Sequence, residues 1–166
     1  MEGQMRILGI DPGLQVCGYA CLETGAEREK LVEAGIIRTD SGSAIEEKLN
    51  RIAADTESLL NSFSPSIVAV EELYAHYSHP RTAILMGHAR GVILQKCAQA
   101  GIEVKSFSAT RIKKSITGNG RASKEQIQRT IQTILSLPAL PEPADVADAI
   151  AAAVCCANSI TSAAKF

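Results

Sequence analysis

Residues Arg6–Asp11 read RILGID, a short apolar run that ends on a carboxylate. The same pattern returns in Ile67–Glu71, which read IVAVE. Short apolar runs rich in β-branched residues predict buried strands, and an ionised carboxylate at the end of a buried strand is costly unless it is paired or binds a metal. If the two strands are neighbours, Asp11 and Glu71 bring their carboxylates to the same end of one sheet.

The order of the remaining elements indicates the fold class. Strands are predicted at Arg6–Asp11, Val16–Leu22, Leu31–Ile37, Ser66–Glu71 and Ile102–Phe107. Helices are predicted over 44–63 with its cap in Asp40–Ser43, over 82–100, in a turn at 110–115, from the cap Ser123 to Leu137, and after Pro138–Pro143. Three consecutive strands, followed by helices that alternate with two more strands, predict an α/β domain of the ribonuclease H-like arrangement, with a five-stranded mixed sheet flanked by helices.

Length and composition limit the domain organisation. At 166 residues and 46% hydrophobic content, the chain is expected to be one domain over 1–166, with flexible ends at 1–4 and about 159–166. The longest apolar stretch, Ala149–Ala157, is too short to cross a bilayer, and no signal sequence precedes the first strand, so we expect a cytoplasmic protein. The cysteines show no zinc-like spacing and are interpreted as reduced thiols: Cys17, Cys21, Cys97, Cys155 and Cys156.

The net charge of −1 hides an asymmetry along the chain. Residues 1–80 contain 6 Lys or Arg and 13 Asp or Glu, whereas residues 81–129 contain 10 Lys or Arg and 2 acids. A single basic residue on a helix is usually only solvated, but a surplus of eight cations in one block predicts a surface that faces a polyanion. The candidate nucleic-acid contacts in this block are Arg81, Arg111, Lys113, Lys114, Arg121 and Lys124.

A second pair of acids, Asp145 and Asp148, opens the alanine-rich last helix, and the i, i+3 spacing places both on one helical face. One acid there would be explained by the helix dipole, but two acids beside the apolar Ala149–Ala153 favour a ligand role. Together with the two strand-end acids they form an all-oxygen donor set, which suits Mg²⁺ or Mn²⁺ better than zinc. Such a set can hold two ions for phosphodiester hydrolysis, and its spacing fits a nuclease and a transposase-like phosphoryl transferase equally well.

Four segments together resemble a known family. Residues 7–13 read ILGIDPG, residues 69–74 AVEELY, residues 87–92 GHARGV and residues 144–151 ADVADAIA. In this order, over nearly the whole chain, they are similar to the RuvC family of Holliday-junction resolvases. The resemblance implies a homodimeric, Mg²⁺-dependent crossover junction endodeoxyribonuclease that resolves four-way DNA junctions by paired symmetric nicks in homologous recombination and DNA repair.

The resemblance also assigns roles to residues. The family's catalytic, metal-binding acids are matched by Asp11, Glu71, Asp145 and Asp148. Its basic residues on DNA near the site are matched by Lys113 and Lys124. Tyr74 falls where the family has an aromatic residue against junction bases, and an exposed ring can stack on an unpaired base.

Two symmetric nicks require two sites related by a two-fold axis, which predicts a dimer. The helix over 82–100 could form the interface, or its apolar residues could face only the core: Ile84, Leu85, Ala89, Val92, Ile93 and Cys97. A branch-migration complex of the RuvA and RuvB type is a further partner implied by the resemblance.

The chain departs from the family pattern in places. Glu72 directly follows Glu71, so the choice of ligand depends on the phase of the strand, and both the family pattern and the apolar alternation favour Glu71. The segment between Glu71 and Arg90 is longer than in the family and contains His76 and His79, which leaves the loop contacts open. The last helix is followed by no basic tail.

Three other interpretations are weighed. A YqgF-type nuclease acting on ribosomal RNA precursors shares the first-strand pattern, although the acid pair Asp145 and Asp148 favours the resolvase. An actin-like nucleotide-binding module is suggested by the segments 11–13 and 40–42, but it needs two such domains and a longer chain. A catalytically silent junction-binding protein is the third, and the complete acidic set argues against it.

Overall fold

The structure, a computed structural model, describes residues 4–25, 28–73 and 78–163. Within these ranges the elements follow the predicted order of three strands and then alternating helices and strands. Their bounds are β1 (Arg6–Asp11), β2 (Val16–Glu23), β3 (Lys30–Arg38), α1 (Ile45–Phe63), β4 (Ile67–Glu71), α2 (Pro80–Gln99), β5 (Glu103–Phe107), α3 (Ala109–Thr117), α4 (Lys124–Ile134) and α5 (Ala144–Ala163).

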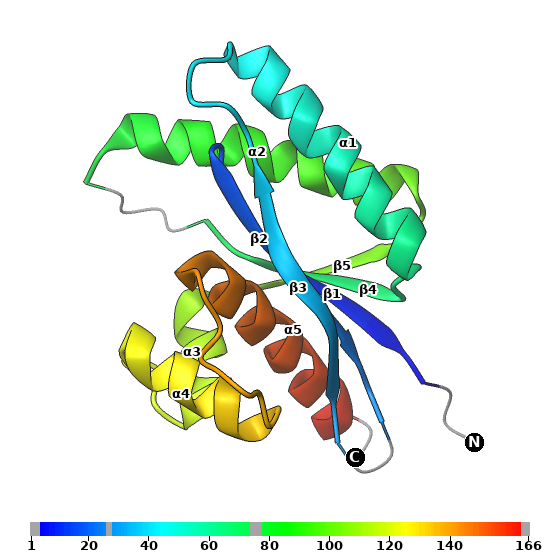
Figure 1. The fold of residues 1–166 in the computed structure, drawn as a ribbon, viewed down its shortest axis with the longest axis vertical. Coiled ribbons are helices and arrows are strands. Elements are labelled where there is room, and N and C mark those ends of the chain that lie inside the picture. The colour runs from blue at the N-terminus through cyan, green and yellow to red at the C-terminus, as the bar shows by residue number, and fades with distance from the viewer. Residues whose placement is uncertain (1–3, 26–27, 74–77, 164–166) are drawn as a thin grey trace.

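The strands form one mixed sheet in the order β3-β2-β1-β4-β5, which confirms the predicted sheet. The β1–β2 and β2–β3 pairs are antiparallel, whereas β4 runs parallel to both β1 and β5. The helices α1 and α2 cover one face, and α3, α4 and α5 cover the other (Figure 1). Because Ile10 pairs with Val70, the next residue of each strand, Asp11 and Glu71, lies at the same end of the sheet.

Side-chain alternation along the two central strands decides which way the acids point. In β1, Leu8 and Ile10 are buried in the core against α1 and α2, whereas Ile7 is buried in the core against α5. Val68 and Val70 of β4 follow the same alternation. Successive residues of a strand face opposite sides, so the acids that end β1 and β4 face the layer of α3, α4 and α5.

The helix α5 lies directly on β1 and β2 because two glycines leave room for its backbone. A Cβ atom at Gly9 would clash with the carbonyl oxygen of Ala149, and a Cβ at Gly18 would clash with the carbonyl oxygen of Asp145. Every residue from Ala149 to Ala157 is buried, and most of these side chains are small enough for close contact. Helix α5 is therefore held at a short distance from the strand that ends on Asp11.

Several helix boundaries differ from the sequence-based expectation. The predicted cap in Asp40–Ser43 is wrong: Ala44 is the N-cap residue of α1, without a side-chain hydrogen bond, and Asp40 instead accepts a hydrogen bond from the backbone N–H of Gly42 at 3.0 Å. The helix predicted from Thr82 begins at Pro80, whose missing N–H suits the first helical turn.

The later helices are longer or shorter than expected. The turn predicted at 110–115 is the full helix α3. The capping box at Ser123 is present. Helix α4 ends at Ile134 rather than at the predicted Leu137, and Ser136, two residues past that end, adopts a positive φ of 52°. Helix α5 continues to Ala163, past the point where we expected helical order to end.

The structure also shows where the apolar residues of two helices lie. Helix α5 is long and apolar enough to cross a membrane, but 61% of its most apolar window is buried in this domain, as in the core helix of a globular protein. In α2, the residues Ala89, Ile93 and Cys97 are fully buried against the sheet, so they belong to the core and not to a dimer interface. Ile84 is 60% exposed and remains available on the surface.

Candidate active site

Three of the predicted acids line one open cavity of about 230 Å³. Asp11 comes from the end of β1, Glu71 from the end of β4 and Asp148 from the second turn of α5. The remaining residues of the cavity are Ala109, Ile112, Lys113, Lys124, Ile127 and Ala151. The chain thus brings together acids from its beginning, middle and end, beside two lysines.

Asp145 lies one helical turn before Asp148 and does not line the cavity. Its charge nevertheless raises the pKa of Asp11 and of Asp148, so its carboxylate stands near both. The contact between Gly18 and the backbone of Asp145 fixes the height of this turn above the sheet. Gly18 also pairs with Asp11, which makes it the link between the two acids.

The carboxyl group of Asp11 is strongly destabilised in its charged form. Burial is the largest cause, followed by the charges of Asp148, Glu71 and Asp145, and together they raise its pKa to about 8. Lys124 acts in the opposite direction. A further positive charge close to this group would therefore favour its ionised form.

Glu71 and Asp148 show the same effect. Burial is the main cause that raises the pKa of each, and repulsion from Asp148 adds to it for Glu71. Lys113 and Lys124 lower the pKa of both carboxyls. The two lysines offset part of the negative charge, and the cavity still favours the binding of cations.

The two neighbouring glutamates have different surroundings. Glu71 is partly buried and lines the cavity, whereas Glu72 is exposed outside it. The backbone N–H of Glu72 donates to the carbonyl of Phe107 at 2.9 Å, which extends the pairing of β4 and β5 by one residue. The phase of the strand therefore puts Glu71 in the cavity, as the apolar alternation predicted.

The donor chemistry of the cavity fits a hard divalent cation, since its acidic groups are carboxylates with oxygen donors only. Among the residues that the structure describes, no three His, Cys, Asp or Glu side chains are close enough to form a complete ligand set. A cation bound among the carboxylates would neutralise their mutual repulsion. The fit therefore rests on donor type and charge.

The two lysines of the cavity are placed by a tightly bonded loop between α3 and α4. Lys113 lies in α3, and Lys124 is the first residue of α4. In the loop, the side chain of Asn119 accepts a hydrogen bond from the N–H of Arg121 at 2.9 Å. The capping box at Ser123 then fixes the start of α4.

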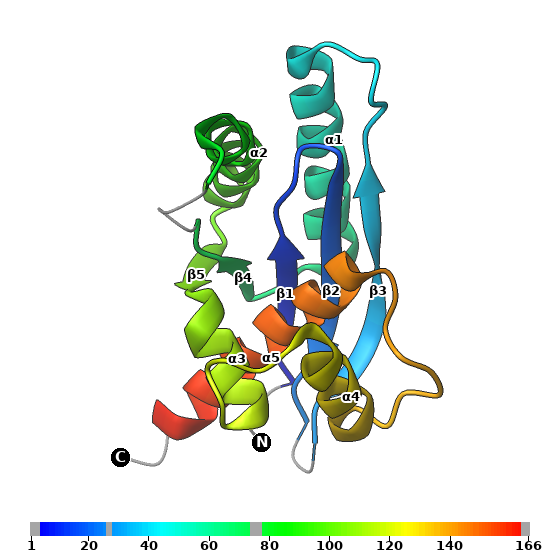
Figure 2. The same ribbon diagram turned by 90° about the vertical axis from the view of Figure 1, so that its left-hand side faces the viewer.

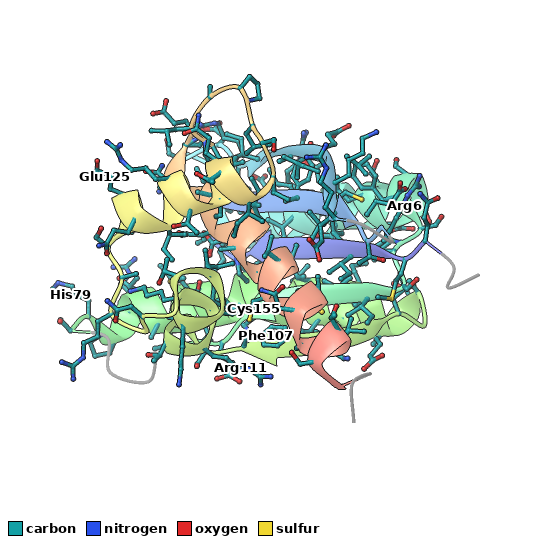
Figure 3. The ribbon with its side chains drawn as sticks, turned by 90° about the horizontal axis from the view of Figure 1, so that it is seen from below. Arg6, His79, Phe107, Arg111, Glu125 and Cys155 are labelled. Atoms are coloured by element: carbon teal, nitrogen blue, oxygen red, sulfur yellow. The ribbon has the colours of Figure 1, made fainter. Side chains whose placement is uncertain are left out.

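The starts of α2 and α4 lie on the same side of the molecule. Figure 3 shows His79, before α2, and Glu125, in the first turn of α4, on that side, whereas Arg6 at the start of β1 lies on the opposite side. In Figure 2, α3, α4 and α5 gather in the lower half of the view, and α1 and α2 lie in the upper half. The cavity lies on the side of α3, α4 and α5, since these helices and the ends of β1 and β4 supply all the residues that line it, including Lys113 and Lys124 of the basic block 81–129.

A family model described as "Crossover junction endodeoxyribonuclease RuvC" matches residues 7–156, which include the four acids and the two lysines. The chain belongs to the RuvC family. A RuvC protein from Rhodopirellula baltica is 47% identical over 149 residues, which cover 90% of this chain and 84% of the relative. One from Heliobacterium modesticaldum is 41% identical over 157 residues, which cover 95% and 96%.

The fold agrees with this assignment. The structure of T. thermophilus RuvC in complex with a Holliday junction substrate matches with a TM-score of 0.90 at 31% identity, over 96% of each chain. The ribonuclease H-like prediction made from the order of the strands is therefore confirmed.

The other cations predicted to contact DNA are spread around this RuvC domain. Arg81, Lys114 and Arg121 are exposed and lie outside the cavity. Arg111 is also exposed, and its guanidinium stacks over the ring of Phe107, 5.0 Å from the ring centroid (Figure 3). Tyr74, together with His76, lies outside the described residues. Of the six predicted cations, all within the described residues, the structure brings only Lys113 and Lys124 to the acids.

Two residues near the RuvC acids have roles at the site that were not predicted from the sequence. The thiol of Cys17 donates to the carbonyl of Gly13 at 2.8 Å and accepts from the N–H of Gly13 at 3.3 Å, which pins the turn that follows Asp11. Arg90 bonds to the backbone of Glu71 and to the side chain of Ser106. Cys17 is the second residue of β2, and nothing in the sequence around it indicates such a role. Arg90, by contrast, lies inside the segment 87–92 that carried the resemblance.

Proposed function

We propose that this chain is a Holliday-junction resolvase that cuts four-way DNA junctions by paired symmetric nicks, in homologous recombination and DNA repair in the cytoplasm. The observation that carries the proposal is the convergence of Asp11, Glu71 and Asp148 in one cavity beside two lysines, in a chain of the RuvC family. The T. thermophilus RuvC structure is a complex with the same kind of substrate, a Holliday junction.

Divalent metal ions, Mg²⁺ with Mn²⁺ as a substitute and two per site, are part of the proposal. Their ligands would be Asp11, Glu71, Asp145 and Asp148, and Asp11 lies on the central strand of the sheet. When bound, such ions supply Lewis-acid stabilisation of a phosphoryl oxygen and a water of lowered pKa. The raised pKa of Asp11 supports this assignment, because a bound cation would stabilise the ionised carboxylate that burial and the neighbouring acids disfavour.

The protein's own groups would handle the DNA. Lys113 and Lys124 border the acids and would hold the scissile phosphate by charge. Ile112 and Ile127 line the same cavity and would exclude bulk water from the reacting phosphate, which strengthens these electrostatic contacts. The exposed cations Arg81, Arg111, Lys114 and Arg121, with Tyr74, would contact the junction farther from the cut.

The proposed enzyme is a single-domain chain that works as a homodimer, since symmetric nicks need two sites. The exposed Ile84 and the partly buried Leu85 and Val92 on α2 support that helix as part of the interface. A branch-migration complex of the RuvA and RuvB type is the proposed partner on the same DNA.

The test is cleavage of an end-labelled synthetic four-way junction, beside a linear duplex and a structured RNA of equal length, with Mg²⁺ or with chelator. Paired symmetric nicks in the junction alone, lost with chelator and in Asp148→Asn, are expected. Cleavage of RNA instead would favour a YqgF-type nuclease, and tight junction binding without nicks would favour a silent binding protein.

A further inference from the structure

Arg90 is a partly buried cation in the middle of α2. Among the described residues it forms no ion pair with an acid. Its guanidinium instead reaches across the sheet end: Nε donates to the backbone carbonyl of Glu71 at 3.3 Å, and Nη2 donates to the hydroxyl of Ser106 at 2.8 Å. One side chain of α2 thus joins the end of β4 to β5.

These two hydrogen bonds fix the backbone at the end of β4. Glu71 is the last residue of β4, and Ser106 pairs with Val70, the residue before it. The side of the sheet covered by α2 holds Val70, whereas the carboxylate of Glu71 faces the cavity on the other side. Arg90 therefore acts on the backbone of Glu71 from behind the cavity.

The charge of Arg90 is not what tunes the Glu71 carboxyl. The cations that lower the pKa of Glu71 are Lys113 and Lys124, both on the cavity side. A planar guanidinium holds donors on separate nitrogens in a rigid arrangement that fits two fixed acceptors, whereas the donors of a lysine rotate about one nitrogen. The contribution of Arg90 to Glu71 is thus geometric.

We propose that Arg90 is a positioning residue for Glu71: through the Glu71 carbonyl and Ser106 it fixes the end of β4, so that the carboxylate is held where a divalent cation binds. The proposal rests on the proposed function for the identity of the reaction, but its content is metal affinity. Partners that orient metal ligands from outside the ligand shell typically change affinity or activity about 10- to 100-fold.

The first experiment measures Mn²⁺ binding without DNA, by the electron paramagnetic resonance signal of free Mn²⁺ during titration. Arg90→Gln is expected to weaken Mn²⁺ binding about 10-fold or more, and Ser106→Ala to weaken it less, since it removes one of the two bonds. Arg51→Gln is the matched control, because it removes the same charge from an exposed arginine of α1 that pairs with Asp55 at 2.7 Å. It should bind Mn²⁺ as the wild type does.

The second experiment separates binding from cleavage. Arg90→Gln and Arg90→Lys are both expected to bind a four-way junction as the wild type does, and to cut it about 10-fold or more slowly under single-turnover conditions, with partial recovery at high Mn²⁺. Arg90→Lys keeps the charge but loses the two-donor geometry, so charge alone is not expected to restore cleavage.

Unchanged Mn²⁺ affinity in folded Arg90→Gln would overturn the proposal, and weakened junction binding with unchanged Mn²⁺ affinity would make Arg90 a DNA contact instead. Thermal unfolding of each variant reports whether it folds. Ser106→Ala keeps the charge and the bulk of Arg90, so it tests the same geometry if Arg90→Gln does not fold. If the wild type fails to cut junctions, the proposed function fails, and the Mn²⁺ comparison still decides the role of Arg90.

Discussion

The acids and the cations of this chain are placed by different parts of the structure. Asp11, Glu71 and Asp148 stand at positions fixed by strand pairing and by the close packing of α5 on the sheet. Most cations of the basic block stand on helices, Arg121 lies in the loop between α3 and α4, and only Lys113 and Lys124 line the cavity. The first group depends on the protein interior, and the second depends mainly on helical and loop surfaces.

This difference separates two functions. Under the proposed function, a change at one of these partly buried acids would alter local charge and metal coordination while leaving the basic surface intact. A change at an exposed cation alters the attraction to a polyanion while leaving the acids in place. Cleavage and junction binding should therefore be separable by mutation, and single substitutions in each group test where that separation holds.

The largest effect is expected from removing an acid. Asp11→Asn and Asp148→Asn should each reduce junction cleavage by at least about 100-fold, because a ligand should matter more than the groups that orient it. Gel-shift titration in the presence of Ca²⁺ should show unchanged junction affinity. Loss of junction binding in both variants would contradict the separation of the acids from the basic surface.

The second prediction concerns a substitution that should displace Asp145 while leaving its side chain unchanged. In Gly18→Ala the new Cβ meets the carbonyl of Asp145, so the start of α5 must shift away from β2. Overpacking of this kind costs about 1–3 kcal/mol, and a displacement of about 1 Å at a reacting site can cost about 100-fold in rate. We expect weaker cleavage and a lower free energy of unfolding in urea.

Gly42→Ala is the control for this variant. Gly42 is exposed, and the nearest atom to its Cβ position is an Asp40 carboxyl oxygen at 3.7 Å, an ordinary contact. Wild-type cleavage in Gly18→Ala would show that α5 does not need this glycine to place its acids.

A smaller effect is expected when cations inside and outside the cavity are compared. Lys124 lowers the pKa of Asp11, Glu71 and Asp148. Lys124→Gln should therefore raise these three pKa values, so that protons compete more strongly with the metal for the carboxylates. The pH profile of Mn²⁺ binding should then move to higher pH. Arg121→Gln should leave that profile in place and reduce the slope of junction affinity against salt by about 1. If both variants shifted the pH profile of Mn²⁺ binding equally, cations inside and outside the cavity would not differ in their effect on the acids.

The smallest expected effect is on stability in the presence of chelator. The pKa of Asp11 is raised from 3.8 to about 8, so the folded protein holds this proton more tightly than the unfolded chain. The corresponding stability is fully present below about pH 4 and is lost as the pH rises through about 8. The difference between pH 7 and pH 9 should be on the order of 1 kcal/mol, or about 2–4 °C in Tm.

Differential scanning fluorimetry can measure this change. Asp11→Asn should reduce the loss of Tm between pH 7 and pH 9, whereas Asp55→Asn, which removes the partly buried partner of the exposed Arg51, should not. The same loss in Asp11→Asn as in the wild type would mean that other groups account for it.

The sheet and the acids were predictable because their signals are local. Short continuous apolar runs marked β1 and β4, and the ends of those runs marked Asp11 and Glu71. The i, i+3 spacing alone placed Asp145 and Asp148 on one side of α5. These features depend on periodicities of 2 and 3.6 residues, which a sequence displays directly.

The remaining features depend on contacts between distant parts of the chain. Nothing near Gly18 indicates that it faces the carbonyl of Asp145, and nothing near Arg90 indicates that it reaches Glu71 and Ser106. The misplaced cap of α1 has another cause, since Asp40 uses its carboxylate in a turn that ends before the helix begins. Partners of this kind become visible only when the elements are packed.

The position of α5 has a consequence for protein synthesis. The ribosome makes β1 and β2 first, whereas the helix that covers them, with Asp145 and Asp148, is made last. A nascent or truncated chain that stops before Ala144 lacks half of the acidic set and exposes the apolar face that α5 would cover. Under the proposed function, chromosomal DNA is therefore exposed to this nuclease only after the complete domain has been translated.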